Sequence, residues 1–127
     1  MTSTGGMTST VEMTLSVSTS KLGEILTGEA GRTVYVFTKD TNGTSVCYDS
    51  CAQNWPAVLT MGTPKGGAGV DASLLGTTTR KDGTLQVTYN GMPLYYYAKD
   101  TVAGDVNGQE VGDVWYVIAP NGKMIEK

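Results

Sequence analysis

Hydrophobic and polar residues alternate strictly near the start of the chain. Val11, Met13, Leu15 and Val17 fall on one side of an extended chain, and the residues between them are polar. A period of two is typical of a half-buried β-strand. We therefore expect a strand that either fills the protein's own sheet or is added to the sheet of a neighbour. Before it, residues 1–10 are small and polar, which predicts a flexible tail.

Short runs of β-forming residues, separated by turn signals, make up the rest of the chain. The Asp-Gly pair at 82–83 and the Asn-Gly pair at 90–91 tolerate the positive φ of tight hairpin turns. Together they predict a three-stranded meander over residues 76–98. The β-branched and aromatic run at 114–119 predicts a late core strand.

Helical signals are confined to single turns, at residues 49–54 and 71–75. A chain of 127 residues is long enough for one buried core and short for two. We therefore predict an all-β fold, a compact antiparallel sandwich or barrel, as one domain over residues 11–127.

The chain also resembles itself when it is shifted by 60 positions. Six of the 25 positions from residue 34 to residue 58 are then identical, well above what average composition gives. The matched pairs are Tyr35 with Tyr95, Lys39 with Lys99, Asp40 with Asp100, Thr41 with Thr101, Val46 with Val106 and Trp55 with Trp115. This pattern predicts two copies of one β-hairpin or meander unit, at about residues 22–59 and 75–118.

The repeated element has the form Tyr-x-aromatic-x-x-Asp. Its aromatic residues, two apart, project from one face of a strand and form a plate for a tryptophan of the opposing strand. The aspartate follows where the strand ends, where a carboxylate accepts hydrogen bonds from the turn. These residues are Tyr35, Phe37, Asp40, Tyr95, Tyr97 and Asp100, with Trp55 and Trp115 as the tryptophans. We expect a structural role for them rather than a catalytic one.

Charge and composition exclude several classes of function. Nine basic and twelve acidic residues give a net charge of −3 without a basic cluster, so we expect no nucleic-acid partner. Histidine is absent, which removes the commonest general base and metal ligand, so we expect no enzyme and no cofactor. No stretch approaches the roughly 20 apolar residues of a membrane-spanning helix.

Several segments, notably CYDSCAQNWPAV at 47–58 and the stretch NGMPLYYYAKDT at 90–101, resemble a bacterial family of secreted repeats. The family comprises predicted lipoproteins with a Y-x-[FWY]-x-x-D motif, and the resemblance covers about residues 20–124. It implies an exported or envelope-tethered protein with a duplicated β unit; a signal sequence would then have preceded this chain. The family's function is unknown, although some members are linked to extracytoplasmic redox proteins. Relatives often carry histidine where this chain has Met92.

Two features leave chemical alternatives open. Cys47 and Cys51 are four residues apart, which suits a structural disulfide, a reactive dithiol or part of a metal site. Thioethers suit Cu(I), so the six methionines, and Met92 in particular, allow a copper site as well as a role as core filler.

Three hypotheses about function follow. The first is a non-catalytic extracytoplasmic module that binds a protein or cell-surface partner or assembles with itself, even into filaments, by strand addition of Val11–Val17. The second is an extracytoplasmic redox protein, binding copper or haem and passing electrons through Tyr96, Trp115 and Tyr116. The third is a carbohydrate or peptidoglycan binder that uses exposed tyrosines such as Tyr96, although for Tyr96 itself we favour pairing within the sheet.

Overall fold

The computed structural model describes residues 13–40 and 43–125. Its strands are β1 (Thr14–Ser20), β2 (Gly23–Thr27), β3 (Tyr35–Phe37), β4 (Leu59–Thr60), β5 (Lys65–Gly66), β6 (Leu75–Thr79), β7 (Leu85–Tyr89), β8 (Met92–Tyr95) and β9 (Trp115–Val117). One α-helical turn, α1 (Ser50–Asn54), and 3-10 turns at Glu29–Gly31, Ala72–Leu74 and Val111–Asp113 complete the fold. The prediction of an all-β fold with single helical turns is therefore confirmed, and both expected turns lie where the sequence placed them.

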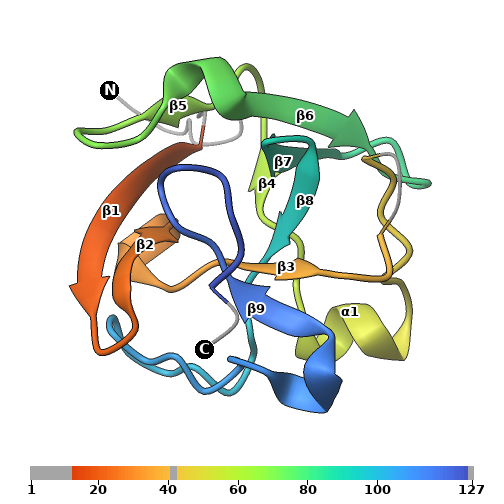
Figure 1. The fold of residues 1–127 in the computed structure, drawn as a ribbon. Helices are drawn as coiled ribbons and strands as arrows, with labels where there is room; N and C mark the ends of the chain where they lie inside the picture. Colours follow the sequence, from red (N-terminus) through yellow and green to blue (C-terminus); the bar gives the residue numbers. More distant parts are fainter. Residues whose placement is uncertain (1–12, 41–42, 126–127) are drawn as a thin grey trace, which may run out of the picture.

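The strands form two sheets. β1 lies between β2, its antiparallel partner, and β5, which runs parallel to it over two residue pairs. In the larger sheet the order is β4-β7-β8-β3-β9, and β6 pairs with β7. Figure 1 shows β3 crossing the middle of the molecule between β8 and β9. This central strand brings the two repeats together, because β8 belongs to the second repeat.

The predicted hairpins of the meander are confirmed. β6 pairs with β7 and β7 with β8, both antiparallel. The second turn has two residues, Asn90 at φ 52° and Gly91 at φ 79°, which are the left-handed values that a type I′ hairpin requires. The turn at Asp82 is closed by its carboxylate, which accepts from the Thr84 N–H at 3.0 Å.

Equivalent hydrogen bonds show the repeat in three dimensions. Thr38 N–H donates to the Val114 carbonyl at 2.9 Å. Their counterparts at a shift of 60, Ala98 for Thr38 and Asn54 for Val114, form the same bond, in which Ala98 N–H donates to the Asn54 carbonyl at 2.8 Å. In the same way, the β1–β2 hairpin corresponds to β6–β7. Leu26 N–H donates to Ile118 at 2.9 Å and Val87 N–H to Val58 at 2.8 Å. The alternating N-terminal strand is thus the first strand of repeat one, paired within this chain.

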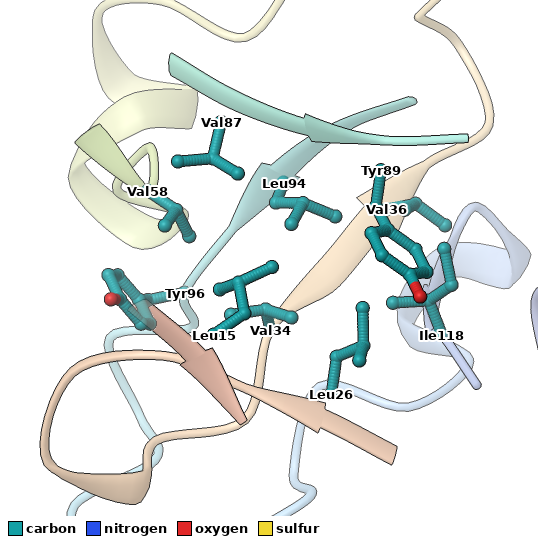
Figure 2. Close-up of a cluster of buried hydrophobic side chains, with 10 residues drawn as sticks. All are labelled: Leu15, Leu26, Val34, Val36, Val58, Val87, Tyr89, Leu94, Tyr96 and Ile118. Atoms are coloured by element: carbon teal, nitrogen blue, oxygen red, sulfur yellow. The ribbon is translucent and has the colours of Figure 1, made fainter. Parts of the chain in front are cut away.

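The core has an aliphatic and an aromatic part, and the alternation of side chains along β3 divides them. Val34 and Val36 face the aliphatic cluster, whereas Tyr35 and Phe37 face the aromatic one. Figure 2 shows the aliphatic cluster, to which both repeats contribute; its buried members are Leu15, Leu26, Val34, Val36, Val58, Val87, Tyr89, Leu94, Tyr96 and Ile118. The aromatic part contains most residues of the repeated motif and is the candidate site.

Candidate functional site

Four aromatic rings lie face to face in one column within the aromatic part of the core. Phe37 stacks on Trp115, with centroids 4.1 Å apart and ring planes 9° apart. Trp115 stacks on Trp55 at 3.8 Å and 1°, and Trp55 stacks on Tyr97 at 4.0 Å and 20°. Each tryptophan therefore packs on the second aromatic residue of the other repeat.

The first aromatic residue of each motif meets the column edge-on. Tyr35 lies 5.4 Å from Trp55 at 83°, and Tyr95 lies 5.2 Å from Trp115 at 89°. Edge-to-face contact is the geometry that the quadrupoles of aromatic rings favour. Because Tyr35 and Tyr95 are also directly paired across β3 and β8, the site has an approximate two-fold arrangement.

The motif aspartates bind these tyrosines across the repeats. The Tyr35 hydroxyl donates to Asp100 Oδ2 at 2.6 Å, and the Tyr95 hydroxyl donates to Asp40 Oδ2 at 2.6 Å. Each tyrosine of one copy thus requires the carboxylate of the other. Nothing in the sequence indicates this crossed pairing, because a shift of 60 positions compares equivalent residues and says nothing of which copies are in contact.

Each carboxylate also closes the turn that follows its strand. Asp40 Oδ1 accepts from the Val46 N–H at 2.8 Å, and Asp100 Oδ1 accepts from the Asn107 N–H at 2.9 Å. This is the position and the bonding expected from the sequence. The carboxylates differ in exposure, because Asp100 is 3% exposed whereas Asp40 is half-buried.

Burial changes the acidity of these groups. It raises the pKa of the Tyr35 and Tyr95 hydroxyls far above the usual range, and the hydrogen bond to a carboxylate adds to the effect. Burial likewise raises the pKa of the Asp40 carboxyl, although the hydrogen bond from Tyr95 opposes the shift. Both phenols therefore keep their protons in the folded protein.

Around Tyr95 the two-fold arrangement breaks down into a polar network. The Arg80 guanidinium donates to Ser45 Oγ at 3.0 Å, to Gln86 Oε1 at 2.9 Å and to the Cys47 carbonyl at 2.8 Å. Ser45 in turn hydrogen-bonds with the Tyr95 hydroxyl. Sequence reasoning missed these buried polar residues, because Arg80 lies in what reads as an exposed turn and Gln86 in an ordinary strand.

Around Tyr35 a glycine replaces that network. Gly108 N–H donates to the Tyr35 hydroxyl at 3.0 Å. A Cβ at Gly108 would lie 2.8 Å from the Trp55 ring and 2.9 Å from the Tyr35 ring. The backbone approaches the column so closely that only glycine fits.

The cysteines lie beside the column. Cys47 and Cys51 form a disulfide with an S–S distance of 2.02 Å, the structural alternative among those predicted. Cys51 belongs to α1, and the buried Cys47 joins the aromatic cluster.

Other residues singled out in the sequence lie away from the column. Met13, Val17 and Met92 are partly buried against the aliphatic cluster, and Leu15 is inside it; Val11 lies outside the described residues. Tyr116 faces that cluster too, since neighbours on a strand point to opposite sides. Within residues 13–40 and 43–125, no three His, Cys, Asp or Glu residues gather as metal ligands would.

Tyr96 is buried, whereas the carbohydrate-binding hypothesis needs this ring to be exposed. This ring is 6% exposed, and its hydroxyl accepts from the Glu29 N–H at 2.9 Å. Tyr96 faces the aliphatic core because it follows Tyr95 on the same extended chain. It is therefore unable to stack on a sugar or to continue the aromatic column.

A second feature is a hollow of about 360 Å³ on the surface. Its lining residues are uncharged: Gly62, Thr63, Pro64, Gly76, Thr77 and Leu85. The preceding chain is apolar and exposed, with Leu59 at 43% and Met61 at 61%.

The outer edge of β6 lies beside this hollow. Arg80 N–H donates to the Thr84 carbonyl and Asn90 N–H to the Leu74 carbonyl, so alternate residues of β6 bond to β7. Leu75, Thr77 and Thr79 consequently turn their N–H and C=O groups to the other side. No other strand among those described pairs with β6.

The described part of the chain contains no helix with the length and apolar character needed to span a membrane. Comparison with protein families gives one description: a secreted repeat of unknown function matches residues 16–59 and again residues 76–119. No curated protein and no solved structure matches the chain. The first match begins within β1, in agreement with the place of that strand in repeat one.

Proposed function

The chain belongs to the family of secreted repeats of unknown function, and on this premise we propose that it is a non-catalytic extracytoplasmic module that assembles with a second copy of itself along β6. The family description, a secreted repeat, agrees with a place outside the cytoplasm. The open edge of β6 carries the proposal.

The sequence of this edge favours pairing. Natural proteins protect edge strands with charges, proline or bulges, and β6 reads LGTTT. Its residues Thr77 and Thr79 are exposed. An unprotected edge of this kind is a template for another strand.

A second copy suits the edge because the strand is self-complementary. If two β6 strands pair antiparallel about Thr77, Thr77 faces its own counterpart and Leu75 faces Thr79. All of these side chains are uncharged, so no like charges oppose each other. Such a contact is isologous and closes a two-fold dimer. The hollow adjoins it, since Gly76 and Thr77 of β6 line the hollow, and its uncharged lining enlarges the area available for burial.

A non-catalytic role is supported by the packing of the aromatic part of the core. Tyr35 and Tyr95 are fully buried, and both motif aspartates are occupied by hydrogen bonds. A substrate has no access to the two tyrosines without unpacking the core.

Sedimentation equilibrium over a wide concentration range tests the assembly. We expect the average mass of the wild-type protein to rise toward that of a dimer. Thr77→Lys and Thr77→Asp should each remain monomeric, since like charges then meet at the two-fold axis. An equimolar mixture of the two variants should dimerise again at low salt, because lysine then faces aspartate.

Thr38→Lys is the matched control, since it adds the same charge at another exposed threonine, directly after β3 and away from β6, and should leave the dimer intact. Wild-type protein that stays monomeric at every concentration overturns the proposal. So does a Thr77→Lys variant that dimerises as well as the wild type.

A further inference from the structure

We propose that the aromatic column, with the Tyr35 and Tyr95 rings that meet it edge-on, is a radical relay. A one-electron oxidant at the protein surface removes an electron from the stacked tryptophans, and a tyrosine, Tyr35 or Tyr95, is then oxidised in their place. This activity is independent of assembly along β6. It rests on the ring geometry and on the crossed tyrosine–aspartate pairs.

The two indoles are arranged to share a positive charge. Trp55 and Trp115 lie parallel with centroids 3.8 Å apart, so their π systems overlap over their faces. A radical cation formed on one ring is stabilised by the other. Phe37 and Tyr97 cover the outer faces of the pair, which keeps water from the oxidised rings.

Each tyrosine has the proton acceptor that its oxidation requires. A phenol that loses an electron becomes a strong acid, and the transfer is easiest when a base already accepts its hydrogen bond. Here the base is Asp100 for Tyr35 and Asp40 for Tyr95, each at 2.6 Å.

The step balances without further reactants. An electron passes from the tyrosine to the tryptophan radical cation, and the phenolic O–H bond breaks as the proton moves to the carboxylate. The products are a neutral tryptophan, a neutral tyrosyl radical and a carboxylic acid. A one-electron reductant resets the relay when the proton returns.

Packing alone does not account for the hydroxyl groups. The motif accepts phenylalanine at the position whose ring stacks on a tryptophan, since Phe37 stands where the second copy has Tyr97. A buried hydroxyl with a charged partner is often no better for stability than an apolar ring of the same shape. Both tyrosines that meet a tryptophan edge-on nevertheless carry a hydroxyl paired to a carboxylate.

Pulse radiolysis of the intact protein tests the relay, with the azide radical as the oxidant probe. We expect the tryptophan radical absorption to decay as a tyrosyl radical absorption grows, at a rate independent of protein concentration. A near-infrared charge-resonance band should report the shared charge on the indole pair. The Tyr35→Phe/Tyr95→Phe double variant should lose the tyrosyl signal, whereas Tyr116→Phe, outside the column, should keep it.

Asp40→Asn combined with Asp100→Asn should slow the transfer more than tenfold, and transfer in the wild type should be slower in D₂O than in H₂O. The isotope measurement needs no variant and so remains decisive if the Asn variant does not fold. A wild-type protein without intramolecular transfer, or with transfer unchanged in the tyrosine double variant, overturns the relay. Neither result bears on dimer formation, which sedimentation measures separately.

Discussion

The two motif aspartates should differ in their contribution to stability, although the sequence makes them look equivalent. Replacing Asp100 by alanine removes the acceptor of the fully buried Tyr35 hydroxyl and of the Asn107 N–H. An unsatisfied buried group costs about 1–3 kcal/mol. Asn107 is exposed, so water replaces part of its bond. We therefore expect Asp100→Ala to lower the free energy of unfolding by about 2–4 kcal/mol.

Asp40→Ala should cost less, about 1 kcal/mol. The Tyr95 hydroxyl retains Ser45 as a partner, and the Val46 N–H lies at an exposed residue, where water can bind it. Urea unfolding followed by circular dichroism at neutral pH measures both values.

A double-mutant cycle isolates the cause. Without Asp100, the Tyr35 hydroxyl still accepts from the Gly108 N–H, but its own hydrogen has no acceptor. If that unsatisfied hydrogen dominates, Tyr35→Phe should recover part of the loss in the Asp100→Ala background. Equal costs for the two aspartates, or a larger cost for Asp40→Ala, would refute the argument from burial.

Three further outcomes can be measured on the same protein. Trp55→Ala and Trp115→Ala should each lower the free energy of unfolding by about 3–5 kcal/mol in urea titrations, because each removes a ring from the middle of the column; unchanged midpoints would contradict the stack. Gly108→Ala should lower it by about 1–3 kcal/mol, because its Cβ meets the Trp55 ring at 2.8 Å; thermal unfolding would show a lower Tm. Burial holds the pKa of Asp40 higher in the folded than in the unfolded chain. Between the unfolded and the folded pKa, the folded state therefore binds more protons than the unfolded state. The contribution of Asp40 to stability consequently falls as pH rises through this range. The stability of wild type minus that of Asp40→Asn should therefore increase on acidification toward pH 4, and a decrease would contradict the direction of the shift.

The sequence predicted those parts of the fold that local physics controls. Alternation along β1, the left-handed Asn90-Gly91 turn and the single turn at α1 depend on residues close in the chain. The repeat of tyrosine, aspartate and tryptophan was also visible, because a fixed shift of 60 aligns it.

The candidate site could be predicted only in its components. Which copy of the motif each aspartate meets depends on β3 and β8 pairing antiparallel at Tyr35 and Tyr95, a contact over 60 residues. The hairpins also differ slightly in length. The shift of 60 that aligns Ser16 of β1 with Gly76 of β6 leaves their partners, Thr27 of β2 and Thr88 of β7, one position out of step.

The divergence of the repeats explains why β6 is open while β1 is covered. In repeat one, the chain leaves β4 and reaches β1, where Lys65 pairs with Thr14 and Gly66 with Leu15. Sixty residues after Lys65 stands Ile125, whose N–H donates to the Val117 carbonyl at 3.0 Å. That segment folds back on β9 instead of crossing to β6. Among the described residues, the second repeat therefore has no counterpart of β5 along β6, and this open edge is where we propose that a second copy of β6 pairs.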